Sequence, residues 1–215
     1  MKKSLSSEEK ETLSFYDARA DEFVLHRKRG IKGYWDAELD RFGYYLPSGS
    51  VIELGCGGGV EATFLGQKYD YLGTDLSKEF IRIARQSNPE LAFETLSLYD
   101  IYDIRESYDG LWCCATLMHI PKRNIQTVLT NMRGLVRKGG VGFISIQGGS
   151  GEYMEISNFA PNLPRRLFAY YRSSEFKKLL RAAGFAVIRE ESKTYPGFAK
   201  DRDEVQWLSY YIRAT

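Results

Sequence analysis

The stretch Val51-Ile-Glu-Leu-Gly55-Cys-Gly57-Gly-Gly-Val60 joins a short apolar segment to a run rich in glycine. The β-branched start predicts a buried strand, and the residues after it predict a tight turn that leads into a helix. Glycine loses more backbone freedom on folding than any other residue, so a cluster of it predicts unusual backbone angles or close contact with a ligand. The stretch therefore predicts a strand–turn–helix unit at which a ligand meets bare backbone.

Apolar strand-like segments alternate with helical ones along the rest of the chain. We expect strands at 51–54, 71–74, 91–95, 108–115, 141–146, from 185 to 189, and within 205–213. We expect helices at 60–68, from Ser77, from Pro121 to the stop at Gly139-Gly140, and at 173–183. This alternation predicts an α/β fold, a doubly wound and mostly parallel seven-stranded sheet. Its binding crevice should lie at the carboxyl ends of the strands, where the glycine run is.

The two ends of this pattern differ from the middle. Before the first strand, apolar spacing predicts one helix from about 6 to 28 and a second at 33–45. After the fifth strand, residues 147–171 are expected to be irregular, and a segment of this length in a compact domain is commonly a binding wall or a lid.

Composition limits the partners that the chain could have. Its 215 residues carry a formal net charge of +2, and no block of basic residues stands out, so nucleic acid is not an expected partner. No apolar run approaches the ~20 residues of a membrane span, and the N-terminus is too polar for a secretory signal. The three cysteines suit neither a disulfide framework nor a zinc site. We expect a cytoplasmic protein with no metal.

The glycine run excludes two common nucleotide motifs. A dinucleotide fingerprint needs a glycine five positions after its first, but Val60 follows Gly55 at that spacing and Ala62 follows Gly57. A P-loop needs Gly-Lys-Ser/Thr, which is absent. Asp75 ends the second expected strand, twenty positions after Gly55, where a carboxylate can hold both ribose hydroxyls. Capping of the next helix is the structural alternative for Asp75.

The pattern Glu53-Leu-Gly55-Cys-Gly57-Gly-Gly59 resembles the glycine loop of the class I S-adenosylmethionine-dependent methyltransferases. In that family the loop lies beneath a ligand that has no phosphate. The stretch Tyr108-Asp-Gly-Leu-Trp-Cys-Cys-Ala-Thr-Leu-Met-His-Ile-Pro is similar to their fourth strand and following loop. Tyr16-Asp-Ala-Arg-Ala-Asp-Glu-Phe, Arg166-Leu-Phe-Ala-Tyr-Tyr and Leu180-Arg-Ala-Ala-Gly-Phe also fit. The sequence of the fourth-strand stretch is similar to that of a bacterial subgroup of tellurite-resistance-like or small-molecule methyltransferases. The resemblance implies a Rossmann-like fold, with residues 1–46 as an N-terminal helical lid, 47–215 as the S-adenosylmethionine-binding domain, and 148–171 as a lid or insert.

The resemblance also implies which residues bind S-adenosylmethionine. Glu53 would order the loop, Gly55 would offer its carbonyl to the methionine amino group, Asp75 would hold the ribose and Leu76 would pack on adenine. Cys114 would reach the methionine portion through its backbone, and Cys56 and Gly57 belong to the cofactor loop. Many relatives have an acidic residue after the third strand, whereas this chain has Ser97 and then Leu98. The backbone there, or Asp100 three residues on, would contact adenine.

Methyl transfer from a sulfonium needs alignment more than it needs a covalent nucleophile, so Cys113 and Cys114 need not be catalytic. His119 borders the expected site of the methyl group and is either a base for a hydroxyl or amine acceptor or a residue that fixes its loop. Tyr16 would contact the cofactor or the acceptor from the lid. Arg165 and Arg166 either bind a negative group of the acceptor or are solvated.

Three functions remain open from the sequence. The first is methyl transfer from S-adenosylmethionine, with S-adenosylhomocysteine as product, to a small-molecule acceptor by in-line displacement. The second is a nicotinamide-dependent oxidoreductase, against which the failed fingerprint counts. The third is a non-catalytic module that binds the same ligand. The chain would be a monomer or a homodimer.

Overall fold

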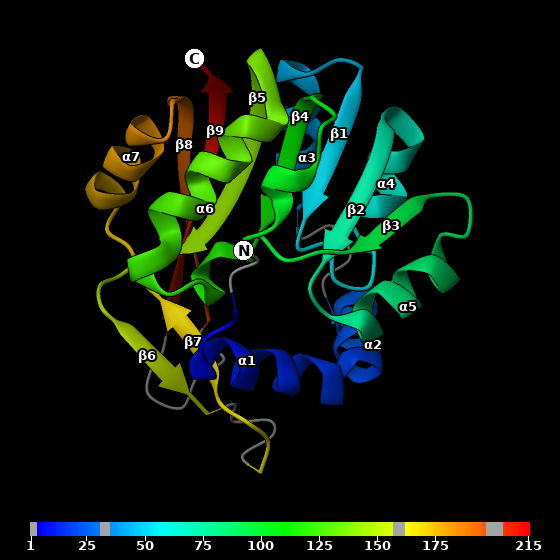
Figure 1. The fold of residues 1–215 in the computed structure, drawn as a ribbon, viewed down its shortest axis with the longest axis vertical. Helices are drawn as coiled ribbons and strands as arrows, with labels where there is room; N and C mark the ends of the chain where they lie inside the picture. Colours follow the sequence, from blue (N-terminus) through cyan, green and yellow to red (C-terminus); the bar gives the residue numbers. More distant parts are fainter. Residues whose placement is uncertain (1–3, 31–34, 157–161, 197–203) are drawn as a thin grey trace.

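The structure is a computed structural model that describes residues 4–30, 35–156, 162–196 and 204–215 (Figure 1). The helices in these residues are α1 (Ser7–Ala18), α2 (Ala20–Gly30), α3 (Asp36–Tyr45), α4 (Ala62–Lys68), α5 (Lys78–Ser87), α6 (Lys122–Leu135) and α7 (Ser173–Ala182). Two short 3-10 turns are η1 (Ile101–Asp103) and η2 (Leu117–His119). The strands are β1 (Ser50–Leu54), β2 (Asp70–Asp75), β3 (Ala92–Thr95), β4 (Tyr108–Cys114), β5 (Val136–Gln147), β6 (Glu152–Glu155), β7 (Arg166–Ala169), β8 (Phe185–Pro196) and β9 (Glu204–Ala214).

Seven of the strands form one sheet, in the order β3-β2-β1-β4-β5-β9-β8. The first five strands of the chain pair with one another in parallel, and β9 lies antiparallel between β5 and β8. The chain moves outward from β1 to β3 and then returns to place β4 on the other side of β1. The predicted α/β, mostly parallel seven-stranded sheet is confirmed, and its switch point lies between β1 and β4.

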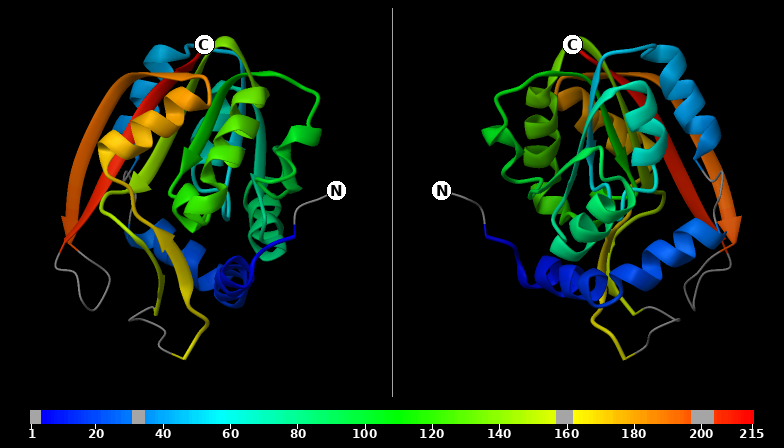
Figure 2. Two further views of the ribbon diagram at one scale, coloured as in Figure 1. Left: turned by 60° about the vertical axis from the view of Figure 1, so that its left-hand side comes forward. Right: turned by 90° about the vertical axis from the view of Figure 1, so that its right-hand side faces the viewer.

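Helices cover both faces of the sheet (Figure 2). Residues of α6 and α7 join one buried cluster with the sheet, and residues of α3, α4 and α5 join the other. Successive residues of β4 alternate between the two clusters, since Leu111 and Cys113 belong to the first and Trp112 to the second. The continuous apolar run in β4 is therefore buried on both faces, as its sequence predicts.

The carboxyl edge of the sheet, at which the parallel strands end, is covered by elements other than the helices that cover its faces. Helix α1 lies across the carboxyl ends of the strands, α2 continues beside α5, and the β6–β7 hairpin lies next to α1 (Figures 1 and 2). Helix α3 instead packs on a face of the sheet, where Phe42 contacts Trp112 with ring centroids 5.4 Å apart. Of the helices in the predicted lid at 1–46, only α1 and α2 thus lie over the carboxyl edge.

Three details of the secondary-structure prediction are wrong. The single helix expected at 6–28 is broken at Arg19, which has φ −129° and ψ 17°. The break lets α2 turn toward α5, where Ala20 and Val24 pack with Phe80. The periodicity of the sequence does not show this break because both halves keep helical spacing.

The helix that begins after Pro121 ends at Leu135, before the expected stop at Gly139-Gly140. Val136 is buried and pairs with Tyr108, so it begins β5 instead of continuing α6. Gly139 has φ +83° and lies where the register of β4 and β5 shifts, so the glycines belong to an irregular strand.

The segment expected to be irregular at 147–171 contains the β6–β7 hairpin. Its strands have four residues each, too few for their alternation to stand out in the sequence. Leu167 and Phe168 of β7 are buried, and this burial selects the pairing. The cap predicted at Ser77 is confirmed, because its side chain accepts a hydrogen bond from the N–H of Phe80 at 3.1 Å.

The described residues include no helix with the length and apolar character needed to cross a bilayer.

Replacing Phe143 by Ala should lower the free energy of unfolding by about 3–5 kcal/mol, because its buried ring stacks on Trp112 at 4.0 Å between centroids. Denaturant titration followed by circular dichroism measures the change. The matched control is Phe64→Ala, whose ring is half exposed and should change stability by about 0.5 kcal/mol or less. Equal losses in the two variants would contradict the location of the core.

Candidate functional site

The turn after β1 is fastened to the end of β2. The N–H groups of Gly55 and Cys56 both donate to the carbonyl of Thr74, at 2.8 and 2.9 Å. Gly55 has φ +79°, and a Cβ there would lie 2.1 Å from Oγ1 of Thr116. Gly57 has φ +51° and open space on its Cβ side. Protein atoms therefore exclude a side chain at Gly55, whereas Gly57 exposes its backbone to free space.

Glu53 lies near the end of β1, just before this turn. It is buried, and its carboxylate accepts a short hydrogen bond from the hydroxyl of Tyr71. The hydroxyl of Thr74 donates to the backbone carbonyl of Glu53 at 2.9 Å. Burial and the neighbouring Glu53 carboxylate raise the pKa of Tyr71 well above its usual value, so the phenol keeps the proton that it donates. These contacts join Glu53 to β2, and its predicted role in ordering the glycine loop stays a prediction.

Asp75 ends β2 with its carboxylate held by backbone groups. Oδ2 accepts from the N–H of Gly57 and Oδ1 from the N–H of Ser77, both at 2.9 Å. Burial raises the pKa of Asp75 to about 6, although these N–H groups favour the ionised form. Each carboxylate oxygen can still accept a further hydrogen bond, which is what two ribose hydroxyls would require.

A cavity of about 210 Å³ opens at this edge of the sheet. The turns after β1 and β4, the ends of β2 and β3, and helices α1 and α2 all contribute to its wall. The eleven site residues predicted from the sequence all line it: Tyr16, Glu53, Gly55, Cys56, Gly57, Asp75, Leu76, Ser97, Leu98, Cys114 and His119. The structure thus brings the predicted residues together, and the role of each stays a prediction.

The region after β3 distinguishes between the two predicted adenine contacts. Ser97 and Leu98 line the cavity, as Leu76 does. Asp100 is not part of the lining, and its buried Oδ1 has no hydrogen-bond partner. Contact of Ser97 and Leu98 with adenine stays a prediction, and Asp100 is the less favoured alternative.

The turn after β4 places strained backbone beside the glycine turn. Ala115 has φ +54°, the one positive φ at a non-glycine residue in the described part of the chain. Its N–H donates to Oγ of Ser145 at 3.0 Å, and that hydroxyl donates to Sγ of Cys114 at 3.3 Å. The Thr116 hydroxyl donates to the carbonyl of Cys114 at 3.0 Å. Such angles persist only where neighbouring contacts hold them, and they concentrate at functional sites.

His119 lies at the end of η2, between two hydrogen-bond partners. Its Nδ1 is 2.7 Å from the carbonyl of Leu167 in β7, and its Nε2 is 2.9 Å from the hydroxyl of Tyr16 in α1. Burial, with a smaller contribution from the Arg166 guanidinium, lowers the pKa of His119 to about 4, although the hydrogen bond to the Leu167 carbonyl acts in the opposite direction. The imidazole is therefore neutral near pH 7. The contact with Leu167 fits the loop-fixing alternative, and proton removal by His119 stays a prediction.

Arg166 begins β7 and Arg165 directly precedes it, and the two side chains have different surroundings. Arg165 is exposed and forms an ion pair with Glu11 of α1, with Nε 3.0 Å from Oε1. The guanidinium of Arg166 lies over the ring of Phe15 at 4.5 Å and within 5.9 Å of the ring of Tyr16. The side chain of His26 lies outside the described part of the chain.

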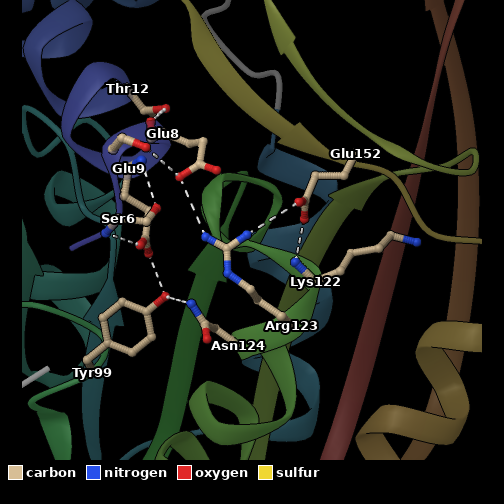
Figure 3. Close-up of polar contacts among 10 residues, drawn as sticks. Ser6, Glu8, Glu9, Thr12, Tyr99, Lys122, Arg123, Asn124 and Glu152 are labelled. Carbon is tan, nitrogen blue, oxygen red and sulfur yellow. Dashed lines mark hydrogen bonds and ion pairs between the residues drawn. The ribbon is translucent and has the colours of Figure 1, made fainter. Parts of the chain in front are cut away.

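Helix α1 is attached to the domain mainly through polar contacts (Figure 3). Near its start, the Glu9 carboxylate accepts from the hydroxyl of Tyr99, and Glu8 pairs with Arg123 of α6 at 3.5 Å. Further along, the Thr12 hydroxyl accepts from the N–H of Leu167 at 2.8 Å. These contacts hold α1 across the open side of the cavity.

Sequence reasoning missed several lining residues, above all Glu9, Thr12 and Leu13 of α1 and Thr116. The α1 residues precede Tyr16 by seven, four and three positions, which places them on the helix face that Tyr16 occupies. Helical spacing from Tyr16 could therefore have found them. Thr116 carried no such signal, because its contact with Gly55 depends on how β1 and β4 pair.

Comparison with known proteins agrees with this geometry. Residues 51–140 match the family model described as a methyltransferase domain. A structure of DhpI with SAH is 20% identical, covers 98% of this chain and 98% of its own, and has a TM-score of 0.73. A DhpI–SAM–HEP complex is 20% identical, with coverage of 98% and 100% and a TM-score of 0.75. The 1,6-didemethyltoxoflavin-N1-methyltransferase of Burkholderia thailandensis, with bound 1,6-didemethyltoxoflavin and S-adenosylhomocysteine, is 17% identical, with coverage of 100% and 93% and a TM-score of 0.65.

No curated protein sequence matches the chain at a significant level. The family match identifies a methyltransferase domain at residues 51–140, and the fold around it is that of class I, S-adenosylmethionine-dependent methyltransferases. The chain therefore contains a methyltransferase domain within a fold of this class. The oxidoreductase alternative is thereby set aside, and the narrower tellurite-resistance-like subgroup is not confirmed.

Replacing Gly55 by Ala should cost more stability than replacing Gly57 by Ala. The first change creates a clash with Thr116 and strains a positive φ, whereas the second strains only an angle close to the left-handed region that other residues reach. We expect a loss of about 2 kcal/mol or more against about 1 kcal/mol, measured by denaturant titration. A larger loss at Gly57 would contradict the described packing of the turn.

Affinity for S-adenosylhomocysteine should decrease as the pH falls through about 6. Ligand hydroxyls need the ionised Asp75 carboxylate, and below its raised pKa binding must first displace a proton. Calorimetry between pH 5 and 8 should show a constant Kd above about 6.5 and a rise approaching tenfold per pH unit below 6. Asp75→Asn should bind weakly at every pH and lose this dependence. An Asp75→Asn variant with the wild-type profile would contradict the assignment.

Proposed function

We propose that the protein transfers the methyl group of S-adenosylmethionine to a small-molecule acceptor in the cavity beneath α1. The observation that supports this most directly is that one cavity joins the glycine turn and Asp75 to the Tyr16–His119 pair. The groups proposed to bind the donor and the groups suited to a polar acceptor thus share a single cavity. When bound, S-adenosylmethionine would supply a methyl group on a sulfonium, which is already a good leaving group.

The residues present fit this donor. Asp75 would accept hydrogen bonds from the ribose hydroxyls, and Leu76 and Leu98 would pack against adenine. Gly57, with no atom within 4 Å of its Cβ position, leaves room for the ligand to lie against backbone. The carbonyls of the turns at Gly55 and Cys114 would face the methionine portion.

The protein's contribution to the reaction would be alignment and exclusion of water. The cavity wall includes apolar side chains of both covering helices, among them Leu13, Phe23 and Val24. The rings of Tyr16, Phe23 and Phe80 contact one another pairwise, with centroids 5.5 to 5.8 Å apart. Holding two reactants in line within such a space is worth up to about 7–11 kcal/mol in favourable models.

A small acceptor is favoured over a macromolecule by the covered position of the cavity and by the modest charge of the chain. Helix α1 and β7 cross the carboxyl edge in direct contact, so a long polymer would have to displace them. The formal net charge of +2 offers little attraction for nucleic acid. The structural neighbours named above include a methyltransferase with a bound small molecule.

The cytoplasm remains our proposed location, on the argument that Cys56, Cys113 and Cys114 are free thiols. A monomer or a homodimer remains the proposed oligomeric state.

Incubation with methyl-labelled S-adenosylmethionine and a small-molecule extract should transfer label to an acceptor, detected by liquid chromatography and mass spectrometry. Asp75→Ala should reduce transfer by about 100-fold or more, because it removes the ribose contact. Asp70→Ala, at the exposed amino end of the same strand, should behave as wild type. Tight binding of S-adenosylhomocysteine without any transfer would instead support the non-catalytic alternative.

A further inference from the structure

The hydrogen bonds of His119 determine where its proton lies. Nδ1 is 2.7 Å from the carbonyl of Leu167, and a carbonyl can only accept, so Nδ1 carries the hydrogen. In a neutral imidazole, Nε2 then has a lone pair. The hydroxyl of Tyr16, 2.9 Å away, must donate to it. The two side chains therefore form a hydrogen-bonded chain with one direction, from the Tyr16 oxygen to His119.

The surroundings keep both side chains in these protonation states. Burial keeps His119 neutral, and the charged group that faces it, Arg166 of β7, disfavours a second positive charge. Burial also raises the pKa of Tyr16, which outweighs the opposite effect of Arg166. The Tyr16 oxygen retains lone pairs beyond its bond to His119, and both side chains line the cavity. A hydroxyl group in the cavity could donate to that oxygen.

We propose that Tyr16 and His119 act together as a proton acceptor for a hydroxyl substrate, with Tyr16 touching the reacting oxygen. This inference rests on the proposed methyl transfer and names the class of its acceptor. Tyr16 would be a catalytic residue, and His119 would take the proton that Tyr16 passes on. The backbone carbonyl of Leu167 would hold the imidazole in the required tautomer.

The step balances in atoms and charge. The acceptor oxygen forms a bond to the methyl carbon while the carbon–sulfur bond breaks and its electron pair stays on sulfur. The acceptor proton moves to the Tyr16 oxygen, and the Tyr16 proton moves to Nε2 of His119. A sulfonium charge is lost and an imidazolium charge appears, so the net charge of the site does not change. The imidazolium then returns its proton to solvent after product leaves.

A weakly basic imidazole suits an oxygen acceptor better than an amine. An alcohol or phenol that gains a methyl group becomes a very strong acid at its oxygen, so even a base with a pKa of about 4 can take the proton. An alkylammonium holds its proton with a pKa of about 10, so the same base could not release the amine for attack. The pair therefore favours hydroxyl substrates.

The proton positions can be tested without knowing the natural acceptor. In protein labelled with 15N at histidine and loaded with S-adenosylhomocysteine, His119 should show a protonated Nδ1 and an unprotonated Nε2 near pH 7. The signal is assigned by its loss in His119→Gln. Tyr16→Phe removes the hydrogen bond to the neutral ring and should raise the pKa of His119 by roughly half to one pH unit.

Tyr99→Phe provides the matched control for this measurement. It removes another hydroxyl of the cavity lining, but that hydroxyl donates to Glu9 and not to His119. The 15N shifts and pKa of His119 should therefore stay at their wild-type values in Tyr99→Phe. A protonated Nε2 in the wild type, or a pKa unchanged by Tyr16→Phe, would overturn the proposal.

Turnover with two simple acceptors tests the chemical role. At pH 8, phenol is protonated, with a pKa near ~10, whereas thiophenol is largely ionised and needs no base. Tyr16→Phe and His119→Gln should lower transfer to phenol by about 100-fold and transfer to thiophenol by about threefold or less. Equal losses with both acceptors, or wild-type transfer to phenol in Tyr16→Phe, would overturn the pair's role.

These outcomes separate the two levels of the proposal. If the wild-type protein does not bind S-adenosylhomocysteine, the proposed methyl transfer is contradicted. Normal binding and normal transfer in Tyr16→Phe would leave methyl transfer in place and contradict only the proton acceptor.

Discussion

The site depends on close packing between the turn after β1 and the turn after β4. A side chain at Gly55 would occupy the position of Oγ1 of Thr116, so the two turns can be neighbours only if one of them is bare backbone. Parallel pairing of β1 with β4 imposes this contact, because it brings their carboxyl ends together. The double hydrogen bond to the Thr74 carbonyl then directs the turn toward Asp75. Packing within the protein thus explains Gly55, whereas the open space at Gly57 leaves its backbone available to a ligand.

A second consequence concerns how the cavity is covered. Helix α1 buries few apolar side chains and is held by hydrogen bonds and ion pairs to Tyr99, Arg123 and Leu167. Polar contacts exchange with water at a small net cost, whereas a large apolar interface would resist separation. The same helix carries Tyr16, so the element that closes the cavity also completes the pair with His119. Closure and the arrangement of the reacting groups are therefore coupled.

The local pattern of the sequence was enough to predict most of the fold. Buried strands such as β4 have long apolar runs, and helix α5 has a capping serine at Ser77, both of which depend on neighbours in sequence. Prediction failed where tertiary contacts override local preference. Val136 leaves its helix to pair with Tyr108, Arg19 breaks a continuous helical pattern, and the β6–β7 hairpin forms because its residues become buried. None of these choices is visible in spacing alone.

The sequence by itself determined the parallel α/β fold, the backbone-only turn and the carboxylate at Asp75. Each of these arises from residues close together in the chain or from the regular alternation of strands and helices. Only the tertiary structure decided that Tyr16 meets His119, 103 positions away, and that Leu167 orients the imidazole. Such contacts depend on where α1 and β7 cross the edge of the sheet. The position of that crossing is set by burial and hydrogen bonding among segments far apart in the sequence. The local spacing of residues does not predict such contacts.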